Sequence, residues 1–518
     1  MLLSFVVAST GCEDDDDVVG DLTIAGVVTG DGGPLEGATV TDGDDENNTT
    51  TTDANGAFSI MIADGGSLVV TAQGFETETI SNINAATVVT PDLDIRDFPE
   101  YFTTAGNRVL DPAFAANSIQ PTASLGNMSD EDNDGFFQDV DFIGAVSPSG
   151  TPWYAGWSFY DNLVNGQTNS DALTVPTNEI TITDADLAAA GTTVNWTNDN
   201  TYILDGFVFV NNGQTLNIQE GTIIQAKAGE AANASALIVA RGGTLNAEGT
   251  AAEPIIFTYE GDTGNSAATL RGQWGGLIVL GNAGLNSAPG ESAIEGIPTG
   301  EARGLYGVGS GFAQDDADNS GILRYVSIRH GGTLIGGDNE INGLTLGGVG
   351  SGTTIEYVEV IGNRDDGIEW FGGTANGKWL ISAFCGDDGI DYDEGYRGKN
   401  QFVVVHQDPA DADRGGEFDG GTDPETATPF AIPTFFNMTF IGNDGSRAIT
   451  LRDNAGGRFY NSIFSGFGRG VDIENLEQDQ DSYKQFLDGN LIFENNVFHN
   501  IGAGDARTDL FVIIDVED

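Results

Sequence analysis

The chain has 518 residues and a formal net charge of −60 at pH 7, from 79 acidic residues against 19 Lys and Arg. A surface this negative repels nucleic-acid phosphates and anionic lipid headgroups, which argues against direct binding to either. No apolar run reaches the roughly 18 residues that a membrane-spanning helix needs. Hydrophobic residues make up 39% of the chain, and 74 glycines without a period of three predict many short elements joined by turns.

The N-terminus carries the pattern of a lipoprotein signal. A short apolar run is followed by small residues and Cys12, and five acidic residues come next. This arrangement resembles the leader of surface-exposed lipoproteins of the Bacteroidota and their relatives. The resemblance implies a signal and acidic leader over residues 1–20 and a lipid on Cys12, which would anchor the protein to the outer membrane at the cell surface. A flexible acidic leader with a free cysteine is the alternative.

Residues 21–95 predict a small β-sandwich, because short strands alternate there with Gly, Asp and Asn. Three phrases are Gly33-Pro-Leu-Glu-Gly-Ala-Thr-Val40, Thr52-Asp-Ala-Asn-Gly-Ala-Phe58 and Gly74-Phe-Glu-Thr77. They resemble the carboxypeptidase regulatory-like domain. That family is an accessory spacer, so the resemblance implies no catalytic group in this part of the chain.

A candidate calcium loop follows the sandwich. Carboxylates at alternate positions before a glycine allow a tight loop to surround an ion with oxygen ligands. The residues at positions 1, 3, 5, 9 and 12 of such a loop are Asp130, Asp132, Asp134, Gln138 and Asp141. Calcium is therefore the expected cofactor, and a solvated acidic turn is the equally weighted alternative.

The remainder of the chain, residues 196–518, is repetitive. Asp365-Asp-Gly-Ile-Glu-Trp370 recurs as Asp387-Asp-Gly-Ile-Asp-Tyr392, a shift of 22 residues. Strands of three to five residues in a repeat of this length are typical of a parallel β-helix, whose coils stack at roughly 4.8 Å. We therefore predict an all-β chain, with a small β-sandwich followed by a long right-handed parallel β-helix. A β-propeller fits less well, since its blades need about 40 residues.

Several phrases of this region carry a second resemblance. They include Asn195-Trp-Thr-Asn-Asp-Asn-Thr-Tyr202, Gln273-Trp-Gly-Gly-Leu-Ile-Val-Leu-Gly281 and Leu323-Arg-Tyr-Val-Ser-Ile-Arg-His-Gly-Gly332. They resemble a family of β-helix lipoproteins found with TonB-dependent receptors in Gram-negative bacteria. The resemblance covers about 300 residues. It implies the fold, an outer-membrane location and a TonB-dependent receptor as a candidate partner, and it says little about chemistry.

Candidate functional residues lie on the outward side of the coils. Alternation along a strand points apolar residues such as Ile368 and Trp370 inward, and Ile390, Tyr392 and Phe418 by the same rule. The outward carboxylates are then Glu369, Asp391, Asp393, Glu417 and Asp419. We expect Glu369, Asp391 and Glu417 to form one ladder on neighbouring coils. Arg397 and His406 are further ligand-binding candidates, because carboxylates paired with Arg397, Lys399 or His406 could perform acid–base chemistry on a sugar polymer.

Three interpretations of this ladder stay open at the sequence level. A cation, most plausibly calcium, could bind between the carboxylates. Carboxylates could also perform acid–base chemistry on a sugar polymer, and Gly386-Asp-Asp-Gly389 resembles the paired-aspartate motif of polygalacturonases. The companion motifs of that family are not evident at matching places, which argues against hydrolysis. The third interpretation is a solvated acidic face paired with arginine.

We expect a cell-surface protein that binds an extracellular ligand, with a glycan as the predicted class, or that partners an outer-membrane transporter. Catalysis is the less favoured prediction. The alternatives are a polysaccharide lyase or hydrolase, and a structural surface or fibre-forming protein. A glycan panel separates the first two, and assembly without ligand favours the third.

The linking segment, residues 96–195, contains sequence phrases that occur in an unexpected order along the chain. In the β-helix lipoproteins that this chain resembles, phrases like those of residues 97–162 follow the last coil, whereas here they precede the first. An uncapped β-helix end exposes strand edges. We therefore expect this segment to dock on the C-terminal end of the β-helix, within one chain rather than on a neighbour, where it would build a fibre.

Overall fold

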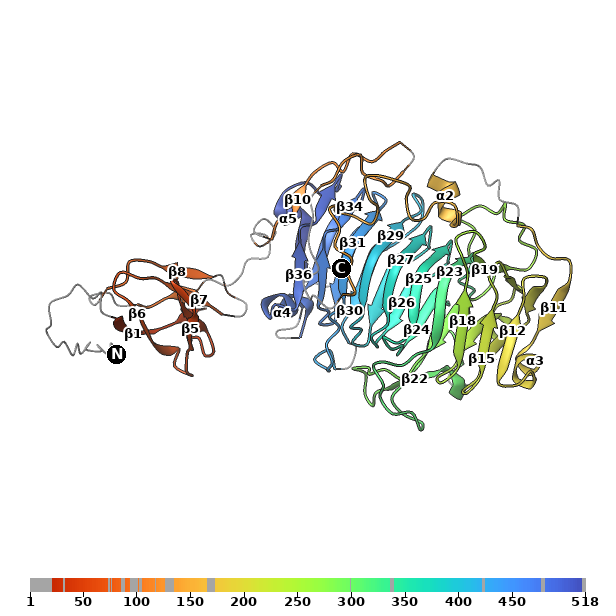
Figure 1. Cartoon of the computed structure of the whole chain (residues 1–518), viewed down its shortest axis with the longest axis horizontal. Coiled ribbons are helices and arrows are strands. Elements are labelled where there is room, and N and C mark those ends of the chain that lie inside the picture. Colours follow the sequence, from red (N-terminus) through yellow and green to blue (C-terminus); the bar gives the residue numbers. More distant parts are fainter. Residues whose placement is uncertain are drawn as a thin grey trace. The chain divides into compact units, whose positions relative to one another are not determined.

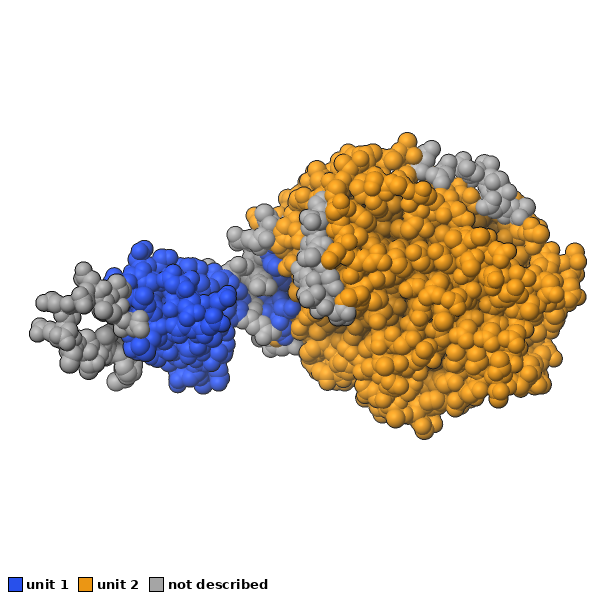
Figure 2. Space-filling view, viewed as in Figure 1, with its two compact units in different colours: residues 1–101, 486–489 blue, residues 102–485, 490–518 orange. Residues whose placement is uncertain are grey.

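A computed structural model shows a chain dominated by short strands, and it divides into two compact units, which are described separately (Figures 1 and 2). The units are residues 1–101 with 486–489, and residues 102–485 with 490–518. The structure describes residues 21–30, 33–72, 75, 77–84, 89–93, 101, 105–116, 118–125, 135–164, 173–298, 300–335, 340–421, 424–476 and 480–514. Within these ranges, no helix has the length and apolar character to cross a membrane.

The described part of the first unit is a small β-sandwich. Its sheets contain β1 (Asp21–Val27) with β6 (Ala57–Ala63), then β5 (Asp45–Thr51), β4 (Thr39–Asp42), β7 (Leu68–Thr71) and β8 (Glu78–Ile80), and finally β3 (Gly33–Pro34), β2 (Thr29–Gly30) and β9 (Asp92–Leu93). Strand β6 buries every second residue, and Phe58, Ile60 and Ile62 share one core with Val40 and Val70. The sandwich therefore forms as the alternation predicts.

The second unit is a parallel β-helix, which confirms the predicted fold class. One sheet has ten strands: β14 (Phe207–Val210), β17 (Ala236–Val239), β20 (Leu277–Leu280), β24 (Leu344–Gly347), β26 (Ile368–Phe371), β28 (Ile390–Asp393), β30 (Arg414–Asp419), β32 (Arg447–Arg452), β35 (Arg469–Glu474) and β38 (Phe511–Ile514). Every neighbouring pair in it is parallel. We call it the ten-stranded sheet.

The other strands of the coils form a seventeen-stranded sheet. It contains β10 (Arg108–Val109), β11 (Glu179–Ile182), β12 (Thr193–Trp196), β13 (Thr201–Leu204), β15 (Thr215–Ile218), β16 (Ile223–Ala226), β18 (Thr244–Glu248), β19 (Ile255–Tyr259), β23 (Gly321–Arg329), β25 (Thr354–Ile361), β27 (Asn376–Ala383), β29 (Lys399–His406), β31 (Thr434–Ile441), β33 (Gly457–Tyr460), β34 (Ile463–Ser465), β36 (Leu491–Glu494) and β37 (Val497–His499). Because β11 and β12 already pair with coil strands, the parallel ladder begins before residue 196.

Short elements occupy the connections. They are α2 (Phe159–Val164), α3 (Asp184–Ala189), β21 (Glu291–Ala293), β22 (Leu305–Gly307), α4 (Ser482–Leu487), α5 (Arg507–Leu510) and the 3₁₀ turns Ala231–Asn233 and Ala302–Gly304. Strands β21 and β22 form an antiparallel hairpin between two coils. Insertions of this kind make the coil length vary along the helix.

One coil shows why the 22-residue repeat sets the register. Strand β26 pairs with β28 so that Ile368 lies beside Ile390, which is the predicted shift. Between them, β27 bends at Trp379, whose φ of 57° is left-handed, and its eight residues thus serve two faces of the coil. The predicted inward residues are fully buried, and the Tyr392 ring stacks on Phe418 at 4.3 Å. Aromatic rings thus continue the core from coil to coil.

The last coil is capped by residues from the N-terminal side of the same chain. Strand β10 pairs in parallel with β37. Asn107 Nδ2 donates to the Phe493 carbonyl at 2.7 Å, and Asn496 N donates to Asn107 Oδ1 at 3.0 Å. Residues 105–110, which we call the cap segment, therefore dock at the C-terminal end within one chain, which confirms the prediction for this part of residues 97–162.

Residues 135–164, which we call the strap, run from this end back over the seventeen-stranded sheet (Figure 1). Gly144 N donates to the Asn461 carbonyl at 2.7 Å, and Ala145 N donates to Thr439 Oγ1 at 2.8 Å. Further along, Trp157 packs edge-on against Tyr325 at 5.5 Å. The tryptophans of this segment therefore serve packing.

Candidate functional site

The outward side of the ten-stranded sheet carries columns of polar residues, because the parallel register places equal positions of successive coils beside one another. The central column contains Thr345, Glu369, Asp391, Glu417, Thr450 and Asp472. The predicted ladder of Glu369, Asp391 and Glu417 is thus confirmed as a geometric feature. A flanking column begins with Arg414, Arg447 and Arg469, and another holds Asp419 beside Arg452.

The acidic half of the central column is covered. Glu369 is 6% exposed and Asp391 9% exposed. Asn342, from the coil before, donates from Nδ2 both to Glu369 and to Glu295, whose Oε1 lies at 2.8 Å. A solvated acidic face is therefore the wrong description of these two carboxylates.

Further along the central column, arginine side chains neutralise the negative charge of Glu417. Arg414 Nη1 and Arg452 Nη2 each lie 2.9 Å from Glu417 Oε1. Arg452 also makes a bidentate pair with Asp419, with Nε–Oδ1 at 3.0 Å and Nη2–Oδ2 at 2.8 Å. Charge-assisted pairs with this geometry hold both partners in place.

Carboxylates crowd the start of β26 and β28, where oxygen atoms from three residues at a time lie within 4.8 Å of one another. The acidic cluster, as we call it, contains Asp365, Asp366, Glu369, Asp387, Asp388, Asp391, Asp413 and Glu417. Burial raises the pKa of Asp365 to about 7, and the charges of Glu295 and Asp387 add to the rise. Burial first, and the neighbouring carboxylates second, also raise the pKa of Glu369 and Asp391 well above the usual range.

Backbone amides organise this cluster in part. Asn342 Oδ1 accepts from Asp366 N, Asp366 Oδ1 accepts from Asp388 N at 2.9 Å, and Asp388 Oδ1 accepts from Arg414 N at 2.6 Å. One oxygen of each aspartate therefore supports the turn of the next coil. The buried Oδ1 of Asp391, in contrast, has no hydrogen-bond partner among the described residues.

Two predicted partners of the ladder have other contacts, which corrects the sequence interpretation. Arg397 Nη2 lies 3.6 Å from Asp316 Oδ1, and its Nη1 donates to the Gly395 carbonyl at 2.6 Å. His406 ends β29 in the other sheet, and its Nδ1 lies 2.9 Å from the Tyr160 hydroxyl. Burial lowers the His406 pKa to about 4. The remaining candidate on β28 is Asp393, which ends the strand. Burial raises the pKa of this carboxyl to about 7.

Arg414 and Arg452, which were not among the predicted site residues, take the cationic role. Arg414, Arg447 and Arg469 open three successive strands of the sheet. The shared position of these arginines at the start of a strand was the sequence signal that could have identified them as partners of the carboxylates. It was weak because the spacing between these coils is irregular.

The structure describes only two of the five residues of the predicted calcium loop, Gln138 and Asp141. Cys12, Asp130, Asp132 and Asp134 lie outside the described residues. Of the remaining positions, Gln138 N donates to Gln401 Oε1 at 2.8 Å. The carbonyl of the exposed Asp141 accepts a hydrogen bond from Ser124 Oγ. The loop therefore stays a prediction.

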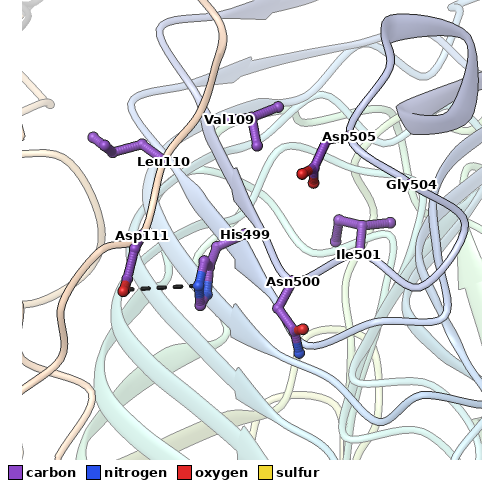
Figure 3. A pocket seen from close by; sticks show the side chains of 8 residues that line it. All are labelled: Val109, Leu110, Asp111, His499, Asn500, Ile501, Gly504 and Asp505. Atoms are coloured by element: carbon purple, nitrogen blue, oxygen red, sulfur yellow. Dashed lines mark ion pairs between the residues drawn. The ribbon is translucent and has the colours of Figure 1, made fainter.

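Two cavities lie elsewhere on the β-helix. One, of about 570 Å³, lies between the cap segment and the last coil, where His499 Nε2 is 3.7 Å from Asp111 Oδ1 (Figure 3). The other, of about 710 Å³, lies between the strap and the first coils, with Arg329 in its lining. The columns of the ten-stranded sheet line neither cavity.

Comparison with known proteins gives one match. Residues 188–515 match the model of the pectate-lyase-like β-helix domain, and that range is more than half of the chain. The description points to glycan binding or to action on a polysaccharide. No curated protein and no solved structure matches the chain. The chain belongs to the pectate-lyase-like β-helix family.

Proposed function

We propose that this protein binds an extracellular glycan on the outward face of the ten-stranded sheet, where β30, β32 and β35 lie side by side. The observation that carries the proposal is the mixed row of carboxylates and guanidinium groups there. The Arg452 side chain is 38% exposed and that of Arg469 is 49% exposed. Planar guanidinium groups and carboxylates are suited to hydrogen-bonding sugar hydroxyls. Family membership supports the same class of ligand.

We further propose that the protein is held at the outer surface of the cell through a lipid on Cys12. A TonB-dependent receptor is the proposed partner for import of the glycan. Metabolic labelling with a fatty-acid analogue, compared between the wild type and Cys12→Ala, tests the anchor, and equal labelling would contradict it.

A binding screen tests the glycan proposal. Neutral and uronate-containing polysaccharides are titrated against the full chain, and the tightest ligand is then measured with Arg452→Ala. We expect at least a tenfold weaker Kd for the glycan. The substitution removes an exposed guanidinium group from the proposed binding face, and it also removes the cation that Glu417 and Asp419 share. Arg324→Ala is the matched control, since Arg324 forms similar pairs on the other sheet and its side chain is 30% exposed. Absence of binding to the whole panel, or equal losses in both variants, would refute the proposal.

Catalysis is a second candidate, and one observation favours it. Carboxylate oxygens of the exposed Asp387, the buried Asp388 and the half-buried Asp413 lie within 4.8 Å of one another. Retaining glycosidases use two carboxyl groups roughly 5–5.5 Å apart. Release of shorter products by the wild type and not by Asp387→Asn would support this function. A wild type that binds a glycan and leaves its length unchanged would eliminate it.

A further inference from the structure

We propose that a divalent cation, with calcium as the best fit, binds between Asp366, Glu369 and Asp391 and joins two successive coils of the β-helix. This ion would be structural and independent of any glycan. Asp366 precedes β26, Glu369 lies within it, and Asp391 lies on β28. The three residues offer ligand oxygens within 4.8 Å of one another.

Little positive charge acts on these three residues within the described part of the chain, where the Arg452 guanidinium interacts with Asp391 without pairing with it. All three are buried, and no Lys or Arg of the described ranges forms an ion pair with any of them. Like charges in a desolvated site must either take up protons or share a counter-ion. A cation between the coils satisfies the second condition and removes the repulsion along the column.

The hydrogen bonds leave ligand positions open. Asp366 uses Oδ1 for the Asp388 amide and keeps its second oxygen for an ion. Glu369 accepts from Asn342 through Oε2 and also shares a hydrogen bond with the Glu295 carboxyl, so an ion at Glu369 would replace the proton of that bond. Asp391 contributes a buried Oδ1 that has no hydrogen-bond partner within the ranges that the structure describes. Calcium takes six to eight oxygen ligands in flexible geometry, whereas magnesium demands a tight octahedron. Three crowded carboxylates, completed by water, therefore suit calcium better.

The next coil provides an internal comparison. Asp388, Asp391 and Glu417 form an equally tight group. There, however, Arg414 Nη1 lies 3.7 Å from Asp388 Oδ2 and 2.9 Å from Glu417 Oε1, and Arg452 also contacts Glu417. Two guanidinium groups already supply the positive charge, so a cation is repelled from that group. This difference places the ion one coil earlier.

The site is enclosed, which indicates a structural ion. Asn342 lies over Glu369 and is itself 1% exposed. An ion held here contacts residues from both coils and offers little surface to a ligand. Binding that requires the folded coils stabilises them by mass action.

The experiment uses the full chain carrying Asp132→Ala, which removes the separate calcium loop predicted earlier. After treatment with EDTA and exchange into metal-free buffer, CaCl₂ and MgCl₂ are titrated calorimetrically, and thermal unfolding is recorded with and without calcium. We expect one calcium site, weaker binding of magnesium, and a Tm that rises by several degrees with calcium. Absence of calcium binding in this background would overturn the proposal.

Two variants locate the ion. In Asp391→Asn we expect at least a tenfold weaker calcium Kd, together with a metal-free Tm equal to or above that of the parent, because one buried charge is removed. Glu369→Gln should weaken binding similarly and serves if the first variant folds poorly. Glu417→Gln is the matched control on the next coil and should retain the site. Loss of binding in Glu417→Gln with retention in Glu369→Gln would overturn the placement.

Discussion

Replacement of Asn107 by Ala tests how the cap segment is held on the last coil. The side chain is 5% exposed and makes two hydrogen bonds, to the Phe493 carbonyl at 2.7 Å and from Asn496 N at 3.0 Å. Alanine leaves both backbone groups without their partner, at about 1–3 kcal/mol each. We expect a loss of about 2–3 kcal/mol in the free energy of local opening, at the low end because water can reach the last coil.

Hydrogen exchange measures this opening directly. The amides of Arg108 and Leu110 donate to the carbonyls of Asn496 and Phe498, between β10 and β37. A loss of about 2 kcal/mol corresponds to roughly 30-fold faster exchange at these two amides. Asn265→Ala, at an exposed loop position on an early coil, is the control and should leave both rates unchanged. If Asn107→Ala exchanges at the wild-type rate, these side-chain hydrogen bonds do not hold the cap.

Three further predictions concern the core, the strap and acid stability. Phe418→Ala should lower the free energy of unfolding by about 3–5 kcal/mol in a denaturant titration, since the ring is fully buried and stacks on Tyr392; a loss below about 1 kcal/mol would contradict the stacked core. Thr439→Val removes the acceptor of Ala145 N, so limited proteolysis should cut the strap several-fold faster, and an unchanged rate would deny this contact a holding role. His406 has a pKa of about 4 in the fold against 6.5 when exposed, so the unfolded chain takes up the proton first and stability is lost as the pH falls from about 6.5 to about 4. His406→Gln should reduce that loss by about 1–3 kcal/mol, and identical pH profiles of unfolding for both proteins would refute the assignment.

The sequence predicts the β-helix well because its repeat is local. The coils that contain β26 and β28 are 22 residues apart, so Glu369 and Asp391 must lie side by side once Ile368 and Ile390 stack. Apolar alternation then fixes which side chains point inward. The central column of the ten-stranded sheet follows from these two facts alone.

The partners of that column could not be predicted in the same way. Glu417 pairs with Asp391 across an insertion that breaks the 22-residue spacing, and Arg452 belongs to a coil beyond a second insertion. Proximity in sequence instead favoured Arg397 and His406, which occupy a turn and the opposite sheet.

Burial of the acidic cluster also lacks a sequence signal. The cover comes from Asn342 and Glu295, which lie on irregular connections without periodicity. The strap poses a related difficulty, because contacts such as that between Trp157 and Tyr325 join residues that no repeat relates. The docking site of the cap segment was indicated only by the unexpected position of the phrases in residues 97–162, which come before the first coil and not after the last.

The docking of the cap segment has a consequence for the order of folding. Successive coils without an insertion close contacts over 22 residues, as between Asn195 and Asn217, whereas Asn107 meets Phe493 across 386 residues. The chain entropy of the longer closure costs about 2.5 kcal/mol more. During synthesis the cap segment emerges first, yet its binding surface is made last. The growing β-helix therefore elongates with an open end, and the cap segment closes that end only after β37 has been added.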